Sequence, residues 1–140
     1  MRKDVLVGII VVVIVAAIAV ILLSLPPEPA RAEITAVTTD KDLYHSNEIM
    51  KIVISVNSAG KMDNTTVRIE GIQDHHGGMR LSHVMPANIS PGPAVFTYDY
   101  QLPSCSSCAG LNPGVYEFNV TLVRNSAIIS NMTQSVQIEQ

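Results

Sequence analysis

The chain has 140 residues and a formal net charge of −3 at pH 7, with twelve acidic and nine basic side chains. Its basic residues form no patch, so we expect no nucleic-acid partner. Residues 33–140 alone, with ten acidic and six basic side chains, are numerous enough to enclose a single hydrophobic core. We therefore expect one globular domain.

Residues 5–23 (VLVGIIVVVIVAAIAVILL) are nineteen residues without a charge. At about 1.5 Å of rise per residue, a helix of this length spans roughly 28 Å, close to the hydrocarbon thickness of a bilayer. Arg2 and Lys3 precede the run, and the next basic residue is Arg31, which places the N-terminus in the cytoplasm. The sequence therefore predicts a cytoplasmic N-terminus (1–4) and a single transmembrane helix (5–23), with the remaining chain outside the cell.

A cleaved signal peptide is the alternative interpretation of this N-terminal segment. Ala30-Arg31-Ala32 has the small-x-small pattern of a signal-peptidase site, and cleavage after Ala32 would give a secreted protein. However, the usual apolar core of a signal peptide has about 7 to 15 residues, and this site lies well beyond the apolar run. The sequence favours a retained signal-anchor. The Pro-rich residues 24–32 predict a stiff, extended linker behind it.

From residue 33 onward, apolar residues alternate with polar ones in short runs separated by Gly, Pro, Asn and Asp. Seven strands are predicted, over residues 33–38, 48–57, 65–72, 79–84, 94–102, 115–123 and 127–139. Turns or loops are predicted at 39–42, 74–78, 86–93 and 124–127. The fold class is therefore all-β, and residues 33–140 are expected to form a seven-stranded antiparallel sandwich of two sheets with one core.

The alternation also predicts which side chains face that core. They are Met50, Ile52, Ile54, Val56, Val67, Ile69, Phe96, Tyr98, Tyr100, Leu102, Tyr116, Phe118, Val120, Leu122, Ile128, Met132, Val136 and Ile138. In the strand that begins at residue 79, Met79, Leu81, His83 and Met85 are predicted to share one face.

Two phrases, TDKDLY (39–44) and NPGVYEFNV (112–120), resemble those of immunoglobulin-like and fibronectin-III-like modules of prokaryotic, often archaeal, cell-surface proteins. The resemblance covers most of residues 33–140 and implies an immunoglobulin-like sandwich. The chain departs from the true immunoglobulin pattern, because it has no Trp and its two Cys are too close together to bridge two sheets.

An apolar helix before such a sandwich also resembles the plan of archaellins, archaeal pilins and stator-type accessory proteins of the archaellum. Filament subunits of that kind have Lys or Arg followed by Gly or Ala ahead of the helix, whereas Asp4 follows Lys3 here. The resemblance therefore implies a stator-like accessory protein of an archaellum or pilus more than a filament subunit.

Cys105 and Cys108 form a CxxC motif between two predicted strands. Such a motif can be half of a zinc site, a redox pair or a small disulfide. Zinc would need two more ligands, and a redox pair usually begins at a helix N-terminus. Outside the cell oxidation is favoured, so we predict a disulfide that fixes the shape of its loop, with the redox and zinc roles as alternatives.

Soft metal ligands gather in one stretch: His75, His76, Met79, His83 and Met85. Copper could use them, but a solvated turn and core packing explain the same residues, so we predict no metal and no cofactor. Three acidic residues, Asp40, Asp42 and Glu48, offer oxygen ligands for calcium without the spacing of an EF-hand loop.

Four Asn-x-Ser/Thr sequons follow the linker, at Asn64, Asn88, Asn119 and Asn131. The last two fall on outward positions of predicted strands and the first two in predicted loops, a distribution that favours N-glycosylation. Asn88 is the poorest acceptor because Pro91 follows its sequon. Ordinary solvent-facing polar residues are the alternative interpretation.

The sequence has no nucleophile elbow, phosphate loop or HExxH motif, and we expect no enzyme. It predicts a membrane-anchored cell-surface glycoprotein with a structural or protein-binding role. Its expected partners are the lipid bilayer, through residues 5–23, and another surface or envelope protein. The alternatives are a redox or metal-handling surface protein that uses the CxxC loop and the His cluster, and an archaellum-associated or pilus-associated protein.

Overall fold

The computed structural model describes residues 3–24, 30–104 and 110–139. In these residues the chain forms one helix and eight strands: α1 (Lys3–Leu23), β1 (Ala32–Thr39), β2 (Leu43–His45), β3 (Ile49–Ser58), β4 (Met62–Gln73), β5 (Met79–Ile89), β6 (Gly92–Gln101), β7 (Gly114–Arg124) and β8 (Ala127–Glu139). The described chain from residue 30 onward is therefore all-β, as predicted.

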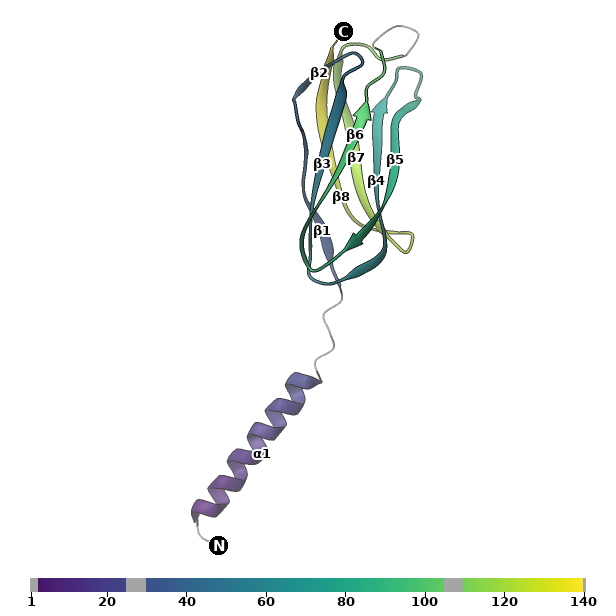
Figure 1. Cartoon of the computed structure of the whole chain (residues 1–140). Helices are drawn as coiled ribbons and strands as arrows, with labels where there is room; N and C mark the ends of the chain where they lie inside the picture. Colours follow the sequence, from purple (N-terminus) through teal and green to yellow (C-terminus); the bar gives the residue numbers. More distant parts are fainter. Residues whose placement is uncertain (1–2, 25–29, 105–109, 140) are drawn as a thin grey trace.

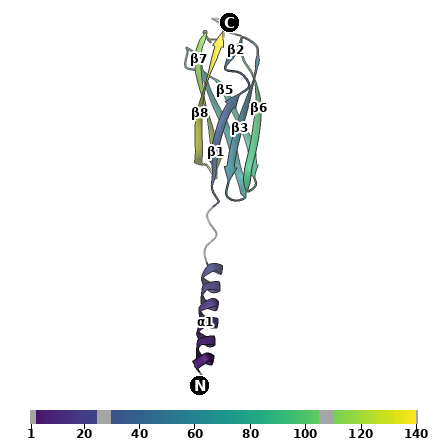
Figure 2. The ribbon, with the colours of Figure 1, turned by 90° about the vertical axis from the view of Figure 1, so that its left-hand side faces the viewer.

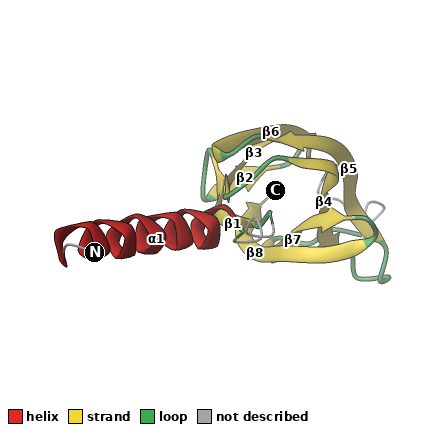
Figure 3. Ribbon diagram, turned by 90° about the horizontal axis from the view of Figure 1, so that it is seen from below, coloured by secondary structure: helices red, strands yellow, loops and turns green. Residues whose placement is uncertain are grey.

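Two sheets pack face to face as an immunoglobulin-like sandwich (Figure 3). One has the strand order β1-β3-β6 and the other the order β2-β8-β7-β4-β5. Figures 1 and 2 show two ends of this sandwich. The proximal end is where the chain enters β1 from the linker, and it also holds the β3–β4 connection and the β7–β8 hairpin. The distal end holds β2, the β4–β5 turn and the end of β8.

The strand count of seven is wrong, because β2 adds an eighth strand. Its three residues are too few to show an alternation in the sequence. They form a strand by pairing in parallel with the end of β8, where Tyr44 lies opposite Ile138. Tyr44 is fully buried and thereby closes the distal end of the core.

The predicted core faces are confirmed for most strands. Met50, Ile52, Ile54 and Val56 of β3 are buried, as are Val67, Ile69, Phe118, Val120, Leu122, Val136 and Ile138. The tyrosines and Phe96 of β6 are half-buried, because β6 is the edge strand of its sheet. The inner faces of both sheets thus share one core, as the alternation predicts.

Ile128 is an exception, since it is 67% exposed and was expected to face the core. In the β7–β8 pair, Leu122 lies opposite Ser130 and Val123 opposite Ile128, so Ile129 is an extra residue. Such a bulge moves the preceding residue to the other face of the sheet. The hairpin itself is confirmed: Asn125 and Ser126 form a two-residue turn, both with positive φ, as a type I′ turn requires.

The predicted loop at 86–93 is also wrong, because β5 continues to Ile89 and β6 begins at Gly92. Pro86 favours a loop in the sequence, since proline has no N–H for a ladder hydrogen bond. In the structure β5 is an edge strand that pairs only with β4, and proline is tolerated on such a strand.

Residues 5–23 are helical, as predicted, within α1. The large apolar side chains described for α1, from Ile10 to Ile21, are exposed, and none of the helix residues whose side chains are described belongs to the sandwich core. Over the described parts of the chain, no helix is long and apolar enough to cross a membrane. The membrane span of residues 5–23 stays a prediction.

Candidate functional site

The β4–β5 turn at the distal end is built around Asp74, whose side chain is only 4% exposed. Its Oδ1 accepts hydrogen bonds from the backbone N–H groups of His76, at 2.9 Å, and Gly78, at 2.7 Å. Its Oδ2 lies 2.7 Å from Nε of Arg80. These bonds, the one from Gly78 first, hold the pKa of Asp74 below its usual value. The carboxylate therefore fixes the turn that carries the two histidines.

His75 ties this turn to the segment that leads into β7. Its backbone N–H donates to the carbonyl oxygen of Gly110 at 3.0 Å, and its Nδ1 lies 2.7 Å from the same oxygen. A carbonyl can only accept, so we assign the ring proton to Nδ1, which leaves the Nε2 lone pair available to a ligand. The rings of His75 and His76 have centroids 4.0 Å apart. The structure thus pairs two imidazoles on a fixed turn.

The other members of the predicted metal cluster lie elsewhere. His83 stacks on Tyr98 of the opposite sheet, with ring centroids 3.9 Å apart. Leu81 is buried and His83 and Met85 are half-buried, as expected for one inward face of β5, whereas Met79 at the start of the strand is 55% exposed. At this point of β4 the backbone of Ile72 has a positive φ, and Ile72 takes a buried position instead. Within residues 3–24, 30–104 and 110–139, no group of three His, Cys, Asp or Glu could hold a metal.

Two of the three acidic residues considered for calcium, Asp40 and Glu48, make internal hydrogen bonds through their side chains. The backbone carbonyl of the third, Asp42, accepts a hydrogen bond from the N–H of Gln137. Asp40 Oδ1 accepts from the Tyr44 hydroxyl at 2.6 Å and from the backbone N–H of Lys51 at 2.9 Å. Glu48 binds Nζ of Lys41 at 3.0 Å and the N–H of His45 at 2.9 Å. Burial first, and then the bond to Asp40, raises the pKa of Tyr44 to about 12. These groups fix the connections on either side of β2.

We expect acid to destabilise the sandwich through these carboxylates. Hydrogen bonds from the Tyr44 hydroxyl, the His45 N–H and the Gly78 N–H, respectively, are the largest causes that lower the pKa of Asp40, Glu48 and Asp74. A carboxyl with a lowered pKa stabilises the fold above its unfolded pKa and loses that contribution as the pH falls through the folded pKa. Urea unfolding should show a constant free energy above about pH 5 and a fall below about pH 4. Asp74→Asn should make that fall shallower, and an unchanged slope would contradict the role of Asp74.

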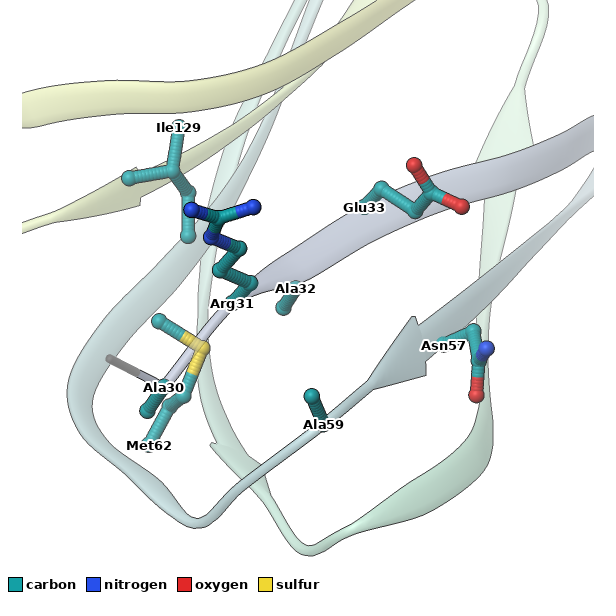
Figure 4. Close-up of a pocket in the computed structure, with 8 residues that line it drawn as sticks. All are labelled: Ala30, Arg31, Ala32, Glu33, Asn57, Ala59, Met62 and Ile129. Atoms are coloured by element: carbon teal, nitrogen blue, oxygen red, sulfur yellow. The ribbon is translucent and has the colours of Figure 1, made fainter. Parts of the chain in front are cut away.

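An open pocket of about 500 Å³ lies at the proximal end, where the chain enters the sandwich (Figure 4). Its lining residues are Ala30, Arg31, Ala32, Glu33, Asn57, Ala59, Met62 and Ile129. Most of them are apolar, with one cation and one anion from the start of the first strand. The exposed side chain of Ile128 lies next along the chain. Ile128 lines a second hollow at the same end, with Val123, Asn125 and Ser126.

The sequons of β7 and β8 lie opposite each other in the same sheet. Asn119 pairs with Thr133, and Thr121 pairs with Asn131. The amide nitrogen of Asn119 donates to Oγ1 of Thr121 at 3.2 Å, and Asn119 is half-buried, whereas Asn131 is exposed. Asn64 and Asn88 are exposed as well, but they lie in β4 and β5, so their predicted loop positions are wrong. Both strands extend further than the sequence predicts.

The predicted disulfide of Cys105 and Cys108 lies outside the described residues and stays a prediction. The described chain resumes at Gly110, the residue that binds His75.

The sequence interpretation missed the structural role of Tyr116 near the start of β7. Its hydroxyl donates to the carbonyl oxygen of Asn112 at 2.7 Å and accepts the N–H of the same residue at 3.0 Å. This bond to the backbone four residues upstream is the tyrosine corner of immunoglobulin-like sandwiches. The spacing of Asn112 and Tyr116 within NPGVY was the signal that could have identified it.

Tyr116→Phe is expected to destabilise the sandwich by about 1–2 kcal/mol, because two hydrogen bonds to the Asn112 backbone are lost while the ring is kept. Urea unfolding measures the change. Tyr100→Phe, which removes a single bond to the Arg80 carbonyl, is the matched control and should cost less. Equal effects of the two substitutions would contradict the special role of Tyr116.

No family model matches the sequence, and a comparison with curated proteins finds no match. Among solved structures, the C-terminal domain of wzt is similar with a TM-score of 0.59 and 12% identity, over 82% of this chain and 80% of that one. The CARDB domain of PF1109 from Pyrococcus furiosus is similar with a TM-score of 0.52 and 16% identity, over 79% of this chain and 94% of that one.

A putative β-galactosidase from Bacteroides fragilis is similar with a TM-score of 0.58 and 17% identity, over 74% of this chain. The chain spans only 17% of that enzyme. At these identities the likeness shows the fold alone. The chain is thus an immunoglobulin-like β-sandwich module, and its resemblance to archaellum proteins stays a prediction.

Proposed function

We propose that this protein is a membrane-anchored, non-catalytic cell-surface module that binds another surface or envelope protein. The observation that carries the proposal is an apolar helix directly before an immunoglobulin-like sandwich. A helix that is apolar on all sides requires an apolar environment, and the described apolar side chains of α1 are exposed. Residues 5–23 form a run of nineteen residues without a charged side chain, long enough as a helix to span the hydrocarbon layer of a bilayer.

The carboxylates whose pKa values are lowered support a binding role without catalysis, because each of them has a structural role. Asp40 is held by Tyr44, Glu48 by Lys41, and Asp74 by Arg80 and two backbone N–H groups. Each of these carboxylates stabilises a connection between strands. Groups of this kind have perturbed pKa values for structural reasons.

The test is to express the full chain with a C-terminal tag and to separate membranes from soluble protein. Extraction at alkaline pH should leave the protein in the membrane, and mass spectrometry should find residues 5–23 in the mature chain. Protease added to intact cells should digest the sandwich. A mature chain that begins at Glu33 and stays in solution would contradict the anchor. Proximity labelling in the same cells then identifies the protein partner.

N-glycosylation belongs to the same proposal. Asn64, Asn88 and Asn131 are exposed acceptors, whereas the amide of Asn119 is half-buried and bound to Thr121. We expect glycans on Asn131 and Asn64 and none on Asn119. Peptide mass spectrometry of protein from the native membrane measures occupancy at each position. Glycans on Asn119 with Asn131 free would contradict this order.

A second candidate function, metal handling at the distal end, is favoured by one observation. The Nδ1 proton of His75 is held by Gly110, an arrangement that leaves Nε2 free for a metal and is common among metal-binding histidines. Calorimetry with Cu²⁺ should then detect binding that His75→Ala or His76→Ala removes. His83→Ala is the matched control, because His83 stacks on Tyr98 instead. Unchanged binding in the first two variants would eliminate this candidate.

A further inference from the structure

The proximal end of the sandwich carries two isoleucines of β8 that are exposed to solvent. Ile128 is 67% exposed and Ile129 is 37% exposed, because the bulge in β8 turns them out of the core. Ile129 lines the open pocket with Ala30, Ala59 and Arg31 (Figure 4). Ile128 lines a second hollow with Val123 and Arg68. We call Ile128, Ile129, Ala30, Ala59 and Arg31 the proximal patch. Met62, which is 1% exposed, belongs to the core instead. Large exposed apolar residues gathered in this way indicate a surface that meets a partner.

Three cations and two anions lie near the proximal patch, where Glu33 lines the same pocket as Arg31 and Asp63 lies 3.4 Å from Lys61. Arg31 lines the pocket, Lys61 lies in the β3–β4 connection, and Arg124 begins the turn of the β7–β8 hairpin. The distal end has a net acidic character, with Asp40, Asp42, Glu48, Asp74 and Glu139 in its connections and strand ends. Lys41 and Arg80 form ion pairs with Glu48 and Asp74 there. Apolar residues bordered by cations are the composition that binds an anionic lipid surface.

The chain length sets how far this end can lie from α1. Five residues separate Ser24, just after α1, from Ala30 in the pocket. Even a fully extended segment of this length spans only roughly 20 Å. If α1 lies in a bilayer, the proximal patch stays within that distance of the lipid headgroups. Such a tether gives a high effective concentration, so that even a weak contact with lipid is populated.

We infer that the proximal patch docks on the lipid surface, with Ile128 and Ile129 at the level of the headgroups and Arg31 beside their phosphates. This inference rests on the proposed role of α1 as a membrane anchor. Docking orients the sandwich, so that its acidic distal end and the histidine turn point away from the membrane. The distal end is then the surface presented to the protein partner.

The chain has no Trp, so one introduced Trp reports its own environment. The experiment uses the full chain in vesicles of phosphatidylcholine and phosphatidylglycerol, with and without brominated acyl chains that quench Trp fluorescence. Ile128→Trp places the probe in the proximal patch. Val115→Trp is the matched control, since Val115 is 70% exposed at the opposite end of the β7–β8 pair. Ile14→Trp reports the insertion of α1.

We expect quenching of the Ile128→Trp fluorescence at least about two-fold stronger than that of Val115→Trp. The difference should shrink when Arg31→Glu and Lys61→Glu are added or when phosphatidylglycerol is left out. Quenching at Ile14→Trp with equal, weak quenching at the other two positions would overturn the docking and leave the anchor in place. No quenching at Ile14→Trp would overturn the anchor and the docking together. A signal at Ile128→Trp that depends on protein concentration and not on lipid would overturn the docking in favour of a contact between two copies.

Discussion

Gly71→Ala is expected to destabilise the sandwich by about 3 kcal/mol or more, a large share of the stability of a domain of this size. A Cβ at residue 71 would lie 2.3 Å from Cα of Phe118 and 2.5 Å from the carbonyl oxygen of Glu117. Both atoms belong to the backbone of β7, so no side-chain rotation can relieve the contact. Gly71 also pairs with Leu81 of β5, and a shift of β4 at this point would disturb three strands.

Urea unfolding of the purified protein measures this loss, with circular dichroism to follow the sheets. Gly114→Ala is the matched control, because Gly114 is also in a strand of the same sheet, and a Cβ there would meet nothing within 4 Å. It should change the free energy of unfolding by less than about 0.5 kcal/mol. A Gly71→Ala protein within about 1 kcal/mol of the original would show that β4 and β7 can separate at low cost.

The strands that the sequence predicts well are those whose pattern is local. In β3, Met50, Ile52, Ile54 and Val56 occupy every second position, and all four are buried. The wrong predictions concern features that depend on contacts between residues distant in the sequence. The strand β2 exists because residues 43–45 pair with residues 137–139, and Ile128 turns outward because of one extra residue opposite β7. The alternation of apolar and polar residues along one strand shows neither the pairing with a distant strand nor an extra residue in that pairing.

In the candidate sites, too, the sequence predicts the local features and does not predict the contacts between distant residues. The composition of residues 74–78 predicts a turn, and the structure has one there. The sequence does not show that Asp74 is the buried acceptor of this turn, because Arg80 and Gly78 approach it only in the hairpin. Nor does it show the bond between His75 and Gly110, which joins residues 35 positions apart. The sequence does not indicate the proximal patch either, because the alternation assigns Ile128 to the core.

The substitution pair Val13→Arg with Ala17→Arg is expected to release the protein from membranes, if α1 is the proposed anchor. Both positions lie near the middle of α1, four residues apart and therefore on one face of the helix. Each Arg at the centre of a membrane helix costs about 2.5–3.5 kcal/mol of insertion free energy. Each Leu, Ile, Phe or Val contributes only about 0.3–0.6 kcal/mol of favourable insertion free energy. The two introduced Arg residues therefore offset the contributions of many apolar side chains of α1. Membrane fractionation, followed by alkaline extraction, measures the loss.

The apolar pair Val13→Leu with Ala17→Leu is the matched control and should stay in the membrane fraction. Because none of the α1 residues whose side chains are described belongs to the sandwich core, the urea midpoint of the sandwich should be the same in both variants. An unchanged midpoint separates loss of the anchor from loss of the fold. If the Arg pair stayed fully in the membrane after alkaline extraction, another part of the chain would have to hold it there, and the assignment of the anchor to α1 would be wrong.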